Sequence, residues 1–450
     1  MATNTCDVVV IGLGPGGEAT ATELARAGLS VVGVDERLVG GECPYYGCIP
    51  SKMVVRAADV LAEGRRIPGL AGAVEISPDW APVAERIRDE ATDDWNDQVA
   101  VDRLEEAGVR FVRGHARLTG PRTVEVDGDT FEAKRGVVLN PGTTPAAPPI
   151  DGLADTPYWT NRDVLRIEAV PASLVVIGGG AIGAELAQGL SRFGVRVTVL
   201  EVADRILAPE EPEASRLVAD VFASEGIQVL TGARIESVSH EDGRFRVAVD
   251  GQDLDAEKLL VAAGRRPSFG DLGLDTVGLD PAARAIDVDE HMRAGDGLWA
   301  LGDVVGKGAF THVSMYQSAI LVRDILGQDG HTADYRAVPR VTFTDPEVGS
   351  VGMTEQQART AGLSVRVGLT DLASSTRGWI ARGQGLIKVV EDADRGVLVG
   401  ATAVGPSGGE ILSMLTTAVH AEVPTDTLRS MIYAYPTFHR AVEDALHRLA

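Results

Sequence analysis

Two segments of the chain repeat the same order of hydrophobic and polar positions. Each begins with a short apolar run, passes through a cluster of glycines, continues as an amphipathic helical pattern and closes with an apolar run that ends on an acid. The first segment covers residues 7–35 and the second covers residues 173–201. Short apolar runs bounded by glycine predict buried strands, so each segment is expected to form a strand–helix–strand unit.

The glycine clusters have the spacing of a dinucleotide-binding turn. Their glycines are Gly12, Gly14 and Gly17 in the first segment and Gly178, Gly180 and Gly183 in the second. Glycine at these places allows a tight bend, close approach of the backbone to a pyrophosphate, and packing of the helix against the strand. The amino end of the next helix then faces the phosphates with free N–H groups and the positive end of its dipole.

An acid follows the first glycine of each cluster by 23 positions, as Asp35 and Glu201. Carboxylates at these strand ends are expected to bind ribose hydroxyls. Because Glu201 would repel a 2′-phosphate, it favours NADH over NADPH, although Arg205 lies four residues on and could weaken that preference. Two complete copies of strand, turn, helix and acid are not expected by chance.

The bulk composition narrows the class of protein. At 450 residues the chain exceeds what one hydrophobic core supports, which indicates about three domains. Its 42 basic and 65 acidic residues give a net charge of −23, which repels nucleic acids and anionic lipids. The N-terminus has no basic leader pattern, and no apolar run approaches the roughly 18 residues of a membrane span. We therefore expect a cytoplasmic protein that binds neither nucleic acid nor membrane.

Only three cysteines occur, and two of them, Cys43 and Cys48, lie in the glycine-rich segment 40–52. Three are too few for a secreted disulfide framework. Pro44 and Gly47 are expected to break regular helix between the two cysteines, which permits the short Cα separation of a disulfide. Cys48 would then begin a helix, where the dipole favours a thiolate.

A metal site and inert core residues are the alternatives to a redox pair for these cysteines. Zinc needs four ligands, and no second cysteine pair or His-x-His group lies nearby, so no metal site is predicted. Inert cysteines would not need the flanking glycines, prolines and lysine of this segment. The segment therefore favours a redox-active pair.

Segment 40–52 resembles the redox motif of the class I pyridine nucleotide-disulfide oxidoreductases, the family of dihydrolipoamide dehydrogenase, glutathione reductase and mercuric reductase. Further stretches that carry the resemblance are 261–267, 301–303, 310–313 and 344–355, so that it covers essentially the whole chain. It implies a homodimeric enzyme in which electrons pass from NADH through FAD to a Cys43–Cys48 disulfide.

The resemblance also implies an α/β fold with two Rossmann-like dinucleotide-binding domains and a C-terminal α+β interface domain. The proline-rich stretch 140–151 marks the exit from the first domain, and strand-like runs at 386–391 and 396–404 belong to the last. The predicted boundaries are 1–147 with 266–335 for the FAD-binding domain, 148–265 for the NAD(P)-binding domain, and 336–450 for the interface domain.

Roles for individual residues follow from the same resemblance. Cys48 would be the thiolate beside the flavin, and Cys43 the outer thiol that attacks the substrate. Lys52 would lie near the flavin, paired with Glu185. The remaining cofactor-binding residues would be Ala116, Gly142, Asp303 and Thr311 for FAD, and Val238 and Gly264 for the nicotinamide dinucleotide.

The chain departs from the family pattern near its C-terminal end. Family members that reduce disulfides carry His-Pro-x-x-x-Glu there, whereas this sequence has Tyr435 at the His position and Arg440 at the Glu position. Tyrosine, with an ordinary pKa near 10, donates a proton but is rarely ionised at neutral pH. Loss of a matched acid–base group lowers the rate about a hundredfold to ten-thousandfold. His439 is a candidate replacement base, but on a helix its side chain is rotated by about 100° from that of Arg440, which favours a solvent or packing role for it.

These departures leave the substrate open. The leading interpretation is a reductase of a disulfide or another thiol-reactive acceptor. Alternatives are a quinone or metal-ion reductase, a non-catalytic FAD-binding protein, and a member that cleaves or carboxylates at a carbon–sulfur bond, although Ser51 and Lys52 match the reductases. Residues 447–450 contain no cysteine pair, so mercuric reductase chemistry is not expected.

Overall fold

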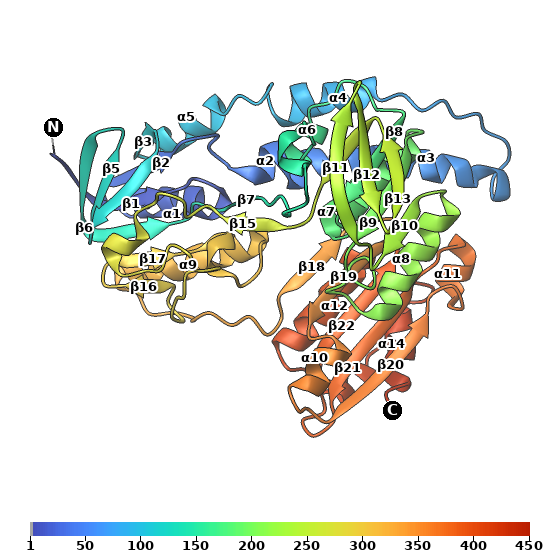
Figure 1. The fold of residues 1–450 in the computed structure, drawn as a ribbon. Helices are drawn as coiled ribbons and strands as arrows, with labels where there is room; N and C mark the ends of the chain where they lie inside the picture. The colour runs from blue at the N-terminus through green and yellow to red at the C-terminus, as the bar shows by residue number, and fades with distance from the viewer. Residues whose placement is uncertain (1–2) are drawn as a thin grey trace. The chain divides into compact units, whose positions relative to one another are not determined.

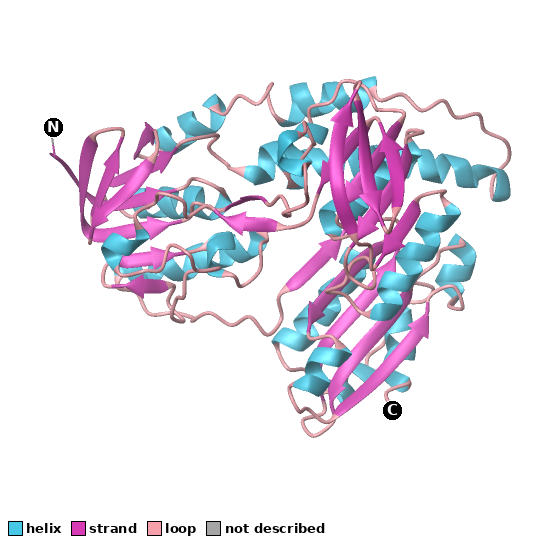
Figure 2. Ribbon diagram, viewed as in Figure 1, coloured by secondary structure: helices cyan, strands magenta, loops and turns pink. Residues whose placement is uncertain are grey.

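The computed structural model describes residues 3–450, and it is a mixed α/β structure as the sequence predicts (Figures 1 and 2). The chain forms two compact units. The first unit contains the chain up to residue 51 together with residues 84–146 and 265–334, and the second contains residues 52–83, 147–264 and 335–450. The three-domain boundaries given above stay a prediction.

A largely parallel sheet forms the centre of the first unit. Its strand order is β16-β17-β6-β1-β2-β3. In chain order the strands are β1 (Thr3–Ile11), β2 (Val31–Asp35), β3 (Val109–Arg113), β6 (Asp129–Leu139), β16 (Arg293–Gly295) and β17 (Leu298–Ala300). β1 pairs in parallel with both β2 and β6. Residues 8–11 of β1 and 31–34 of β2 are buried at every position, which explains why these parts of the two strands are continuous runs of apolar residues and glycine.

Helices and smaller strands complete this unit. Helix α1 (Pro15–Arg26) follows β1 and lies beside α9 (Thr311–Leu326). The other elements are β4 (Ala116–Gly120), β5 (Thr123–Val126), β7 (Thr143–Pro145), β15 (Arg265–Pro267), α2 (Glu42–Tyr46), α5 (Gln98–Glu106), the π-helix η2 (Arg86–Ala91), and the 3-10 turns η4 (Leu274–Val277) and η5 (Gly302–Val305). Helices α3 (Cys48–Arg66) and α4 (Ala81–Glu85) run across the boundary between the units.

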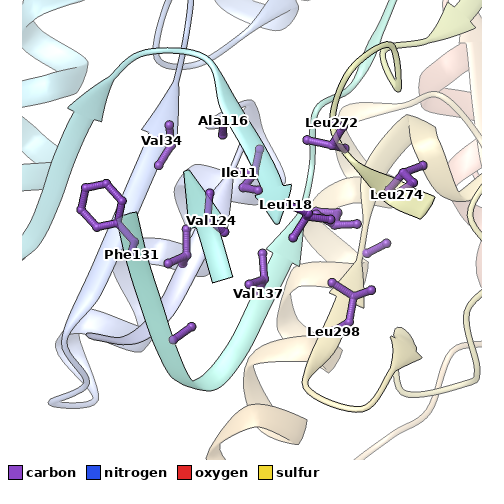
Figure 3. Packing of buried hydrophobic residues seen from close by; sticks show 14 of the residues in the cluster. Ile11, Val34, Ala116, Leu118, Val124, Phe131, Val137, Leu272, Leu274 and Leu298 are labelled. Atoms are coloured by element: carbon purple, nitrogen blue, oxygen red, sulfur yellow. The ribbon is translucent and has the colours of Figure 1, made fainter. Parts of the chain in front are cut away.

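The core of the first unit lies between the parallel strands and the β4–β5 hairpin. Figure 3 shows Ile11 and Val137 of the sheet close to Leu118 of the hairpin, with Leu272 and Leu274 beside them. All five side chains are buried. Burial of each such side chain contributes about 1.5–3 kcal/mol, so this cluster fixes the frame on which the glycine turn and the cysteine segment are built.

In the second unit a parallel sheet repeats the first nucleotide-binding pattern. Its order is β10-β9-β8-β14. The strands are β8 (Ser173–Ile177), β9 (Arg196–Glu201), β10 (Gln228–Thr231) and β14 (Lys258–Val261), with helices α6 (Asn161–Val164), α7 (Ala181–Arg192) and α8 (Pro212–Ser224) and the turns η1 (Ile67–Gly69) and η3 (Leu153–Asp155). A separate antiparallel sheet joins β11 (Ile235–Glu241), β12 (Arg244–Val249) and β13 (Gln252–Ala256).

The C-terminal part of the second unit is an antiparallel sheet with helices packed on it. The order is β18-β19-β22-β21-β20. Its strands are β18 (Pro339–Thr342), β19 (Glu347–Gly352), β20 (Val365–Asp371), β21 (Leu386–Asp392) and β22 (Val397–Gly405), and its helices are α10 (Glu355–Thr360), α11 (Thr376–Ala381), α12 (Gly408–His420), α13 (Thr425–Arg429) and α14 (Arg440–His447). The expected α+β region after residue 336 is therefore present. No helix within residues 3–450 is long and apolar enough to cross a membrane.

Candidate active site

Cys43 and Cys48 are carried by two successive helices, in the part of the chain up to residue 51 that belongs to the first unit. Cys43 lies in the short helix α2, and α3 begins at Cys48, as the sequence predicts. Both are free thiols, with Cys43 half-buried and Cys48 exposed. The side chain of Cys43 is hydrogen-bonded to that of Cys48, and this bond, followed by burial, raises the pKa of Cys43. The raised pKa of Cys43 favours its protonated form.

The segment between the cysteines differs from the prediction in one respect. Pro44 does not interrupt a helix, because α2 runs from Glu42 through Tyr46 and includes it. The third residue of a helix needs no N–H partner within the helix, so proline is tolerated in the first turn. Gly47, with φ −135° and ψ −114°, makes the break between the two helices by itself.

Thr311 stands at the first position of α9, close to both sulfurs. Its Oγ1 lies 3.3 Å from Cys48 Sγ. A hydrogen bond from the same side chain also lowers the pKa of Cys43, although the effects that raise this pKa are larger. The structure thus brings Thr311 to the redox pair, whereas its predicted contact with FAD stays a prediction.

The first glycine turn is closely packed, as a dinucleotide site requires. Gly12 has φ +88°, and a Cβ there would lie 2.1 Å from the carbonyl oxygen of Asn140. A Cβ on Gly17 would lie 2.0 Å from the carbonyl oxygen of Gly12. Within the described chain, no side chain caps α1 at Gly14, so the amino end of this helix suits a phosphate group. These features fit FAD at the first turn.

Asp35 ends β2 beside this turn. Its Oδ2 accepts the Leu13 N–H at 2.7 Å, and its Oδ1 accepts the Arg37 N–H at 2.8 Å. Burial raises the pKa of Asp35, and the two backbone bonds oppose that rise. The carboxylate is thereby held at the strand end where a ribose would be bound.

Asp303 belongs to a polar chain that sequence reasoning did not find. Thr143 donates its hydroxyl to Asp303 Oδ2 at 2.7 Å. Arg265 in turn donates to Thr143 Oγ1 and to its carbonyl oxygen, each at 2.7 Å, and its guanidinium lies 3.5 Å from Glu42. Gly142, next to Thr143, is left-handed with φ +68°. The position of Arg265 in the motif at 261–267 was the available signal, but its partner lies 122 residues away.

Lys52 and Glu185 form an ion pair inside the second unit. Lys52 Nζ lies 2.6 Å from Glu185 Oε2, and Glu185 is buried on α7. The other oxygen, Oε1, accepts the Phe343 N–H at 2.8 Å. Lys52 Nζ also lies 4.7 Å from the centre of the Phe343 ring. The predicted partnership is present, and its placement near a flavin stays a prediction.

The second glycine turn repeats the packing of the first. A Cβ on Gly178 would lie 2.4 Å from the carbonyl oxygen of Ala262, and one on Gly183 would lie 1.9 Å from that of Gly178. By contrast, a Cβ on Gly180 or Gly264 would meet nothing within 4 Å. The turn therefore combines a tight backbone with open space, which fits a bound nicotinamide dinucleotide.

Glu201 and Arg205 both make bonds within the loop after β9. Glu201 Oε2 accepts the Gly179 N–H at 2.7 Å, and Oε1 accepts the Ala203 N–H at 2.8 Å. Arg205 Nη2 donates to the carbonyl oxygen of Ala208 at 2.7 Å, and Nη1 lies 3.1 Å from Asp204. The guanidinium is thus engaged by its own loop.

Two predicted cofactor residues, Ala116 and Val238, have buried side chains. Ala116 belongs to the core of the first unit, and Val238 to that of the nucleotide-binding part of the second. The Val238 N–H donates to the carbonyl oxygen of Asp151 at 2.8 Å. Contact of either residue with a cofactor would therefore use backbone atoms.

Tyr435 is exposed, and its hydroxyl donates to Thr376 Oγ1 at 3.1 Å. Arg440 is paired with Glu443 one turn along α14. His439 lies with its ring 5.8 Å from that of Tyr433. Among the described residues, neither Arg440 nor His439 is seen to form a hydrogen bond with Tyr435.

Comparison with known proteins gives the family. The model described as pyridine nucleotide-disulphide oxidoreductase matches residues 6–318, and the dimerisation domain of the same family matches residues 338–446. The chain belongs to this family.

Several relatives of known activity are similar over almost the whole chain. The dihydrolipoyl dehydrogenase of Thermus scotoductus is 33% identical over 467 residues, which cover 99% of this chain and 98% of that one. The mercuric reductase of Bacillus cereus is 30% identical over 450 residues, covering 98% of this chain and 71% of that one.

Solved structures agree with the family. The Cu(II) complex of the HOCl-induced flavoprotein disulfide reductase RclA from Escherichia coli has a TM-score of 0.86 and 26% identity, covering 99% of both chains. LpdA from Mycobacterium tuberculosis has a TM-score of 0.87 and 25% identity, covering 98% of this chain and 99% of that one.

Family membership makes the protein a flavoprotein pyridine nucleotide-disulfide oxidoreductase. Members use FAD and a pyridine nucleotide, and the dimerisation domain supports homodimer formation. Both glycine turns fit those cofactors. Within residues 3–450 no group of three or more His, Cys, Asp or Glu side chains that could hold a metal ion was found.

Proposed function

We propose that the protein is an NADH-dependent reductase that passes electrons through Cys48 and Cys43 to a small disulfide or another thiophilic acceptor. The observation that carries this proposal is that Cys43 in α2 and Cys48 at the start of α3 are free thiols whose side chains are hydrogen-bonded to each other. When bound, FAD and NADH supply hydride transfer and two-electron reduction of the disulfide.

Each of the two glycine turns is assigned one of these cofactors. FAD is assigned to the turn at Gly12–Gly17 with Asp35, Ala116, Gly142, Asp303 and Thr311, and to Lys52 through its pair with Glu185. NADH is assigned to the turn at Gly178–Gly183 with Glu201, Val238 and Gly264. The proposed domains are 1–147 with 266–335 for FAD, 148–265 for NADH, and 336–450 for the interface between two copies.

The preference for NADH rests on Glu201 and Arg205. A 2′-phosphate would meet the Glu201 carboxylate, and Arg205 is already bonded to Ala208 and Asp204. An arginine that recognises a 2′-phosphate has to offer its N–H groups to it. The kcat/KM for NADH should therefore exceed that for NADPH, and equal values for the two cofactors would contradict this assignment.

The thiol chemistry follows from the proton on Cys43. As a proton leaves Cys43, its sulfur attacks the acceptor disulfide, forming a mixed disulfide and releasing one thiolate that takes up a proton. The Cys48 thiolate then attacks the Cys43 sulfur, which restores the Cys43–Cys48 disulfide and releases the second thiolate. We propose that Tyr435 of a second copy donates a hydrogen bond to a leaving sulfur, in place of the family's histidine.

A soft metal ion is the second candidate acceptor. Two adjacent thiols are the ligands that soft metals prefer. Relatives named mercuric reductase and the solved Cu(II) complex of RclA favour this class, against the expectation drawn above from residues 447–450, which contain no cysteine pair. Neither acceptor requires a histidine to protonate a carbon, unlike cleavage or carboxylation at a carbon–sulfur bond. A pair of reactive thiols also suits a reducing, cytoplasmic location.

The experiment is NADH consumption by the FAD-loaded enzyme with one acceptor at a time: a small disulfide, mercury(II), copper(II), a quinone or a keto-thioether. Turnover with the disulfide or a soft metal ion that is lost in both Cys43→Ser and Cys48→Ser supports the proposal. Turnover of the disulfide or of the soft metal ion that survives in either variant contradicts the proposal. Turnover with the keto-thioether alone also contradicts it.

A further inference from the structure

A turn about fifty residues from the cysteines in sequence, in the first unit, has unusual backbone geometry. Asp93, Asp94 and Trp95 have φ of 48°, 53° and 57°. Three consecutive residues with side chains are thus left-handed, where Cβ crowds the carbonyl oxygen. Such backbone persists only where surrounding bonds determine it.

Thr92 supplies several of those bonds. Its buried hydroxyl donates to the carbonyl oxygen of Ile87 at 3.0 Å and accepts the Trp95 N–H at 3.3 Å. The Asp94 N–H donates to the carbonyl oxygen of Arg88 at 2.7 Å. The preceding helix η2 is a π-helix, a form that is rare and frequently found near functional sites. The left-handed turn is therefore built into a fixed frame.

Trp95 in this turn and Asp97 just after it bind the backbone on the two sides of Gly40 and Gly41. Trp95 Nε1 donates to the carbonyl oxygen of Tyr45 at 3.2 Å. Asp97 Oδ2 accepts the Val39 N–H at 2.7 Å. Tyr45 lies between the two cysteines in the last turn of α2, whose carbonyl oxygens have no partner within a helix of five residues. The indole thus satisfies a carbonyl group of the redox loop itself.

We propose that Trp95 is a positioning residue for the redox pair, which restrains the loop between Cys43 and Cys48 and so favours the disulfide over the dithiol. The inference rests on the proposed redox function of the pair. A disulfide fixes the loop whether or not Trp95 is present, because its geometry is narrow. Only the dithiol gains conformational freedom when the restraint is lost, and that gain shifts the equilibrium toward the dithiol.

The test is the thiol–disulfide exchange equilibrium between the Cys43–Cys48 pair of the FAD-loaded protein and dithiothreitol, measured in the absence of NADH. The protein dithiol becomes a disulfide with loss of two electrons and two protons, and oxidised dithiothreitol takes up both to become its dithiol. The fractions of Cys43 and Cys48 that are alkylated after an acid quench give the equilibrium constant. Trp95→Phe should make the disulfide less favoured by about fivefold, the factor that corresponds to the lower end of the backbone conformational entropy of one residue.

Trp80→Phe is the matched control in the second unit. Trp80 is buried, and its indole N–H donates to the carbonyl oxygen of Ile167 at 2.9 Å. This substitution also removes one indole-to-carbonyl bond, but it should leave the exchange constant unchanged. A shift of the same size in Trp80→Phe would overturn the inference.

Two substitutions at Thr92 keep the inference testable if Trp95→Phe does not fold. Thr92→Val removes the hydroxyl that holds the left-handed turn and should act in the same direction as Trp95→Phe. Thr92→Ser keeps the hydroxyl and should retain the wild-type constant. An unchanged constant in folded Trp95→Phe or Thr92→Val contradicts the inference. If the wild-type protein forms no Cys43–Cys48 disulfide at any dithiothreitol ratio, the proposed function fails as well.

Discussion

Lys52 Nζ lies 2.6 Å from Glu185 Oε2, so an ion pair joins α3 to α7 within the second unit. Lys52 follows Cys48 by one turn of the same helix, and Glu185 is buried with its second oxygen bonded to the Phe343 N–H. The pair therefore restrains the part of α3 that belongs to the second unit against α7.

Glu185→Gln should lower the free energy of unfolding by about 1–3 kcal/mol, because a hydrogen bond to a charged group is lost while glutamine still accepts the Phe343 N–H. Urea unfolding of the FAD-loaded protein measures this change. The control is Glu63→Gln, which breaks an exposed pair with Arg66 and should change the stability by at most about 1 kcal/mol. Equal losses in the two variants would contradict the structural role of the Lys52–Glu185 pair.

The raised pKa of Cys43 predicts the pH dependence of its alkylation in the reduced protein. Because the hydrogen bond to Cys48 is the largest cause of that rise, Cys48→Ala, which removes the bonding group, should lower the pKa of Cys43, although burial still raises it. The thiolate is the reactive form, so iodoacetamide should label Cys43 at pH 8 faster in Cys48→Ala than in the wild type. Peptide mass spectrometry distinguishes Cys43 from the buried Cys6, and slower labelling in the variant would refute the assignment.

Asp59 predicts a pH effect on stability. Burial, with the charge of Asp345, raises the pKa of Asp59 to about 6, against the opposing effect of Arg192 and Arg66. Between the ordinary aspartate pKa of about 4 and about 6, the native state binds more protons at this site than the unfolded state. The contribution of Asp59 to stability therefore falls as pH rises through that window.

Asp59→Asn removes this titration. The difference in melting temperature between the variant and the wild type should change in favour of the variant as the pH rises from 4 to 6.5. Differential scanning calorimetry at matched ionic strength gives that difference. A constant difference over the whole range would show that Asp59 titrates normally.

Tyr435 is predicted to act through its hydroxyl. Tyr435→Phe should lower the turnover of a small disulfide by about tenfold, since a hydrogen-bond donor to a leaving sulfur is lost. Thr376→Val removes the bonding partner of the phenol and keeps the hydroxyl, so it should retain most of the activity. Steady-state kinetics with NADH held at saturation compares the two variants, and the same loss in both would assign Tyr435 a structural role.

The sequence predicted the parts of this site that depend on local pattern. The glycine turns, the strand-end acids Asp35 and Glu201, and a helix that begins at Cys48 follow from spacing and apolar periodicity. The interpretation of Pro44 as a helix breaker was wrong, because the position of a proline within a helix decides its effect and α2 could not be located from its five residues.

Other parts could not be predicted, because they join segments that are distant in the chain. Arg265 reaches Thr143 across 122 residues, and Trp95 reaches Tyr45 across 50. Asp93 and Asp94 are of a type that adopts left-handed backbone more often than most, but three such residues in succession depend on the bonds of Thr92 to its neighbours. The role of Tyr435 likewise depends on which groups of a second copy face it.

Anaerobic titration of the FAD-loaded enzyme with NADH tests the central claim most directly. The account predicts that one equivalent of NADH makes Cys43 and Cys48, and no other cysteine, newly available to alkylation, together with long-wavelength absorbance from a thiolate beside the flavin. Bleaching of the flavin by the first equivalent, with no new thiols and no long-wavelength band, would contradict the claim that electrons pass into the Cys43–Cys48 pair.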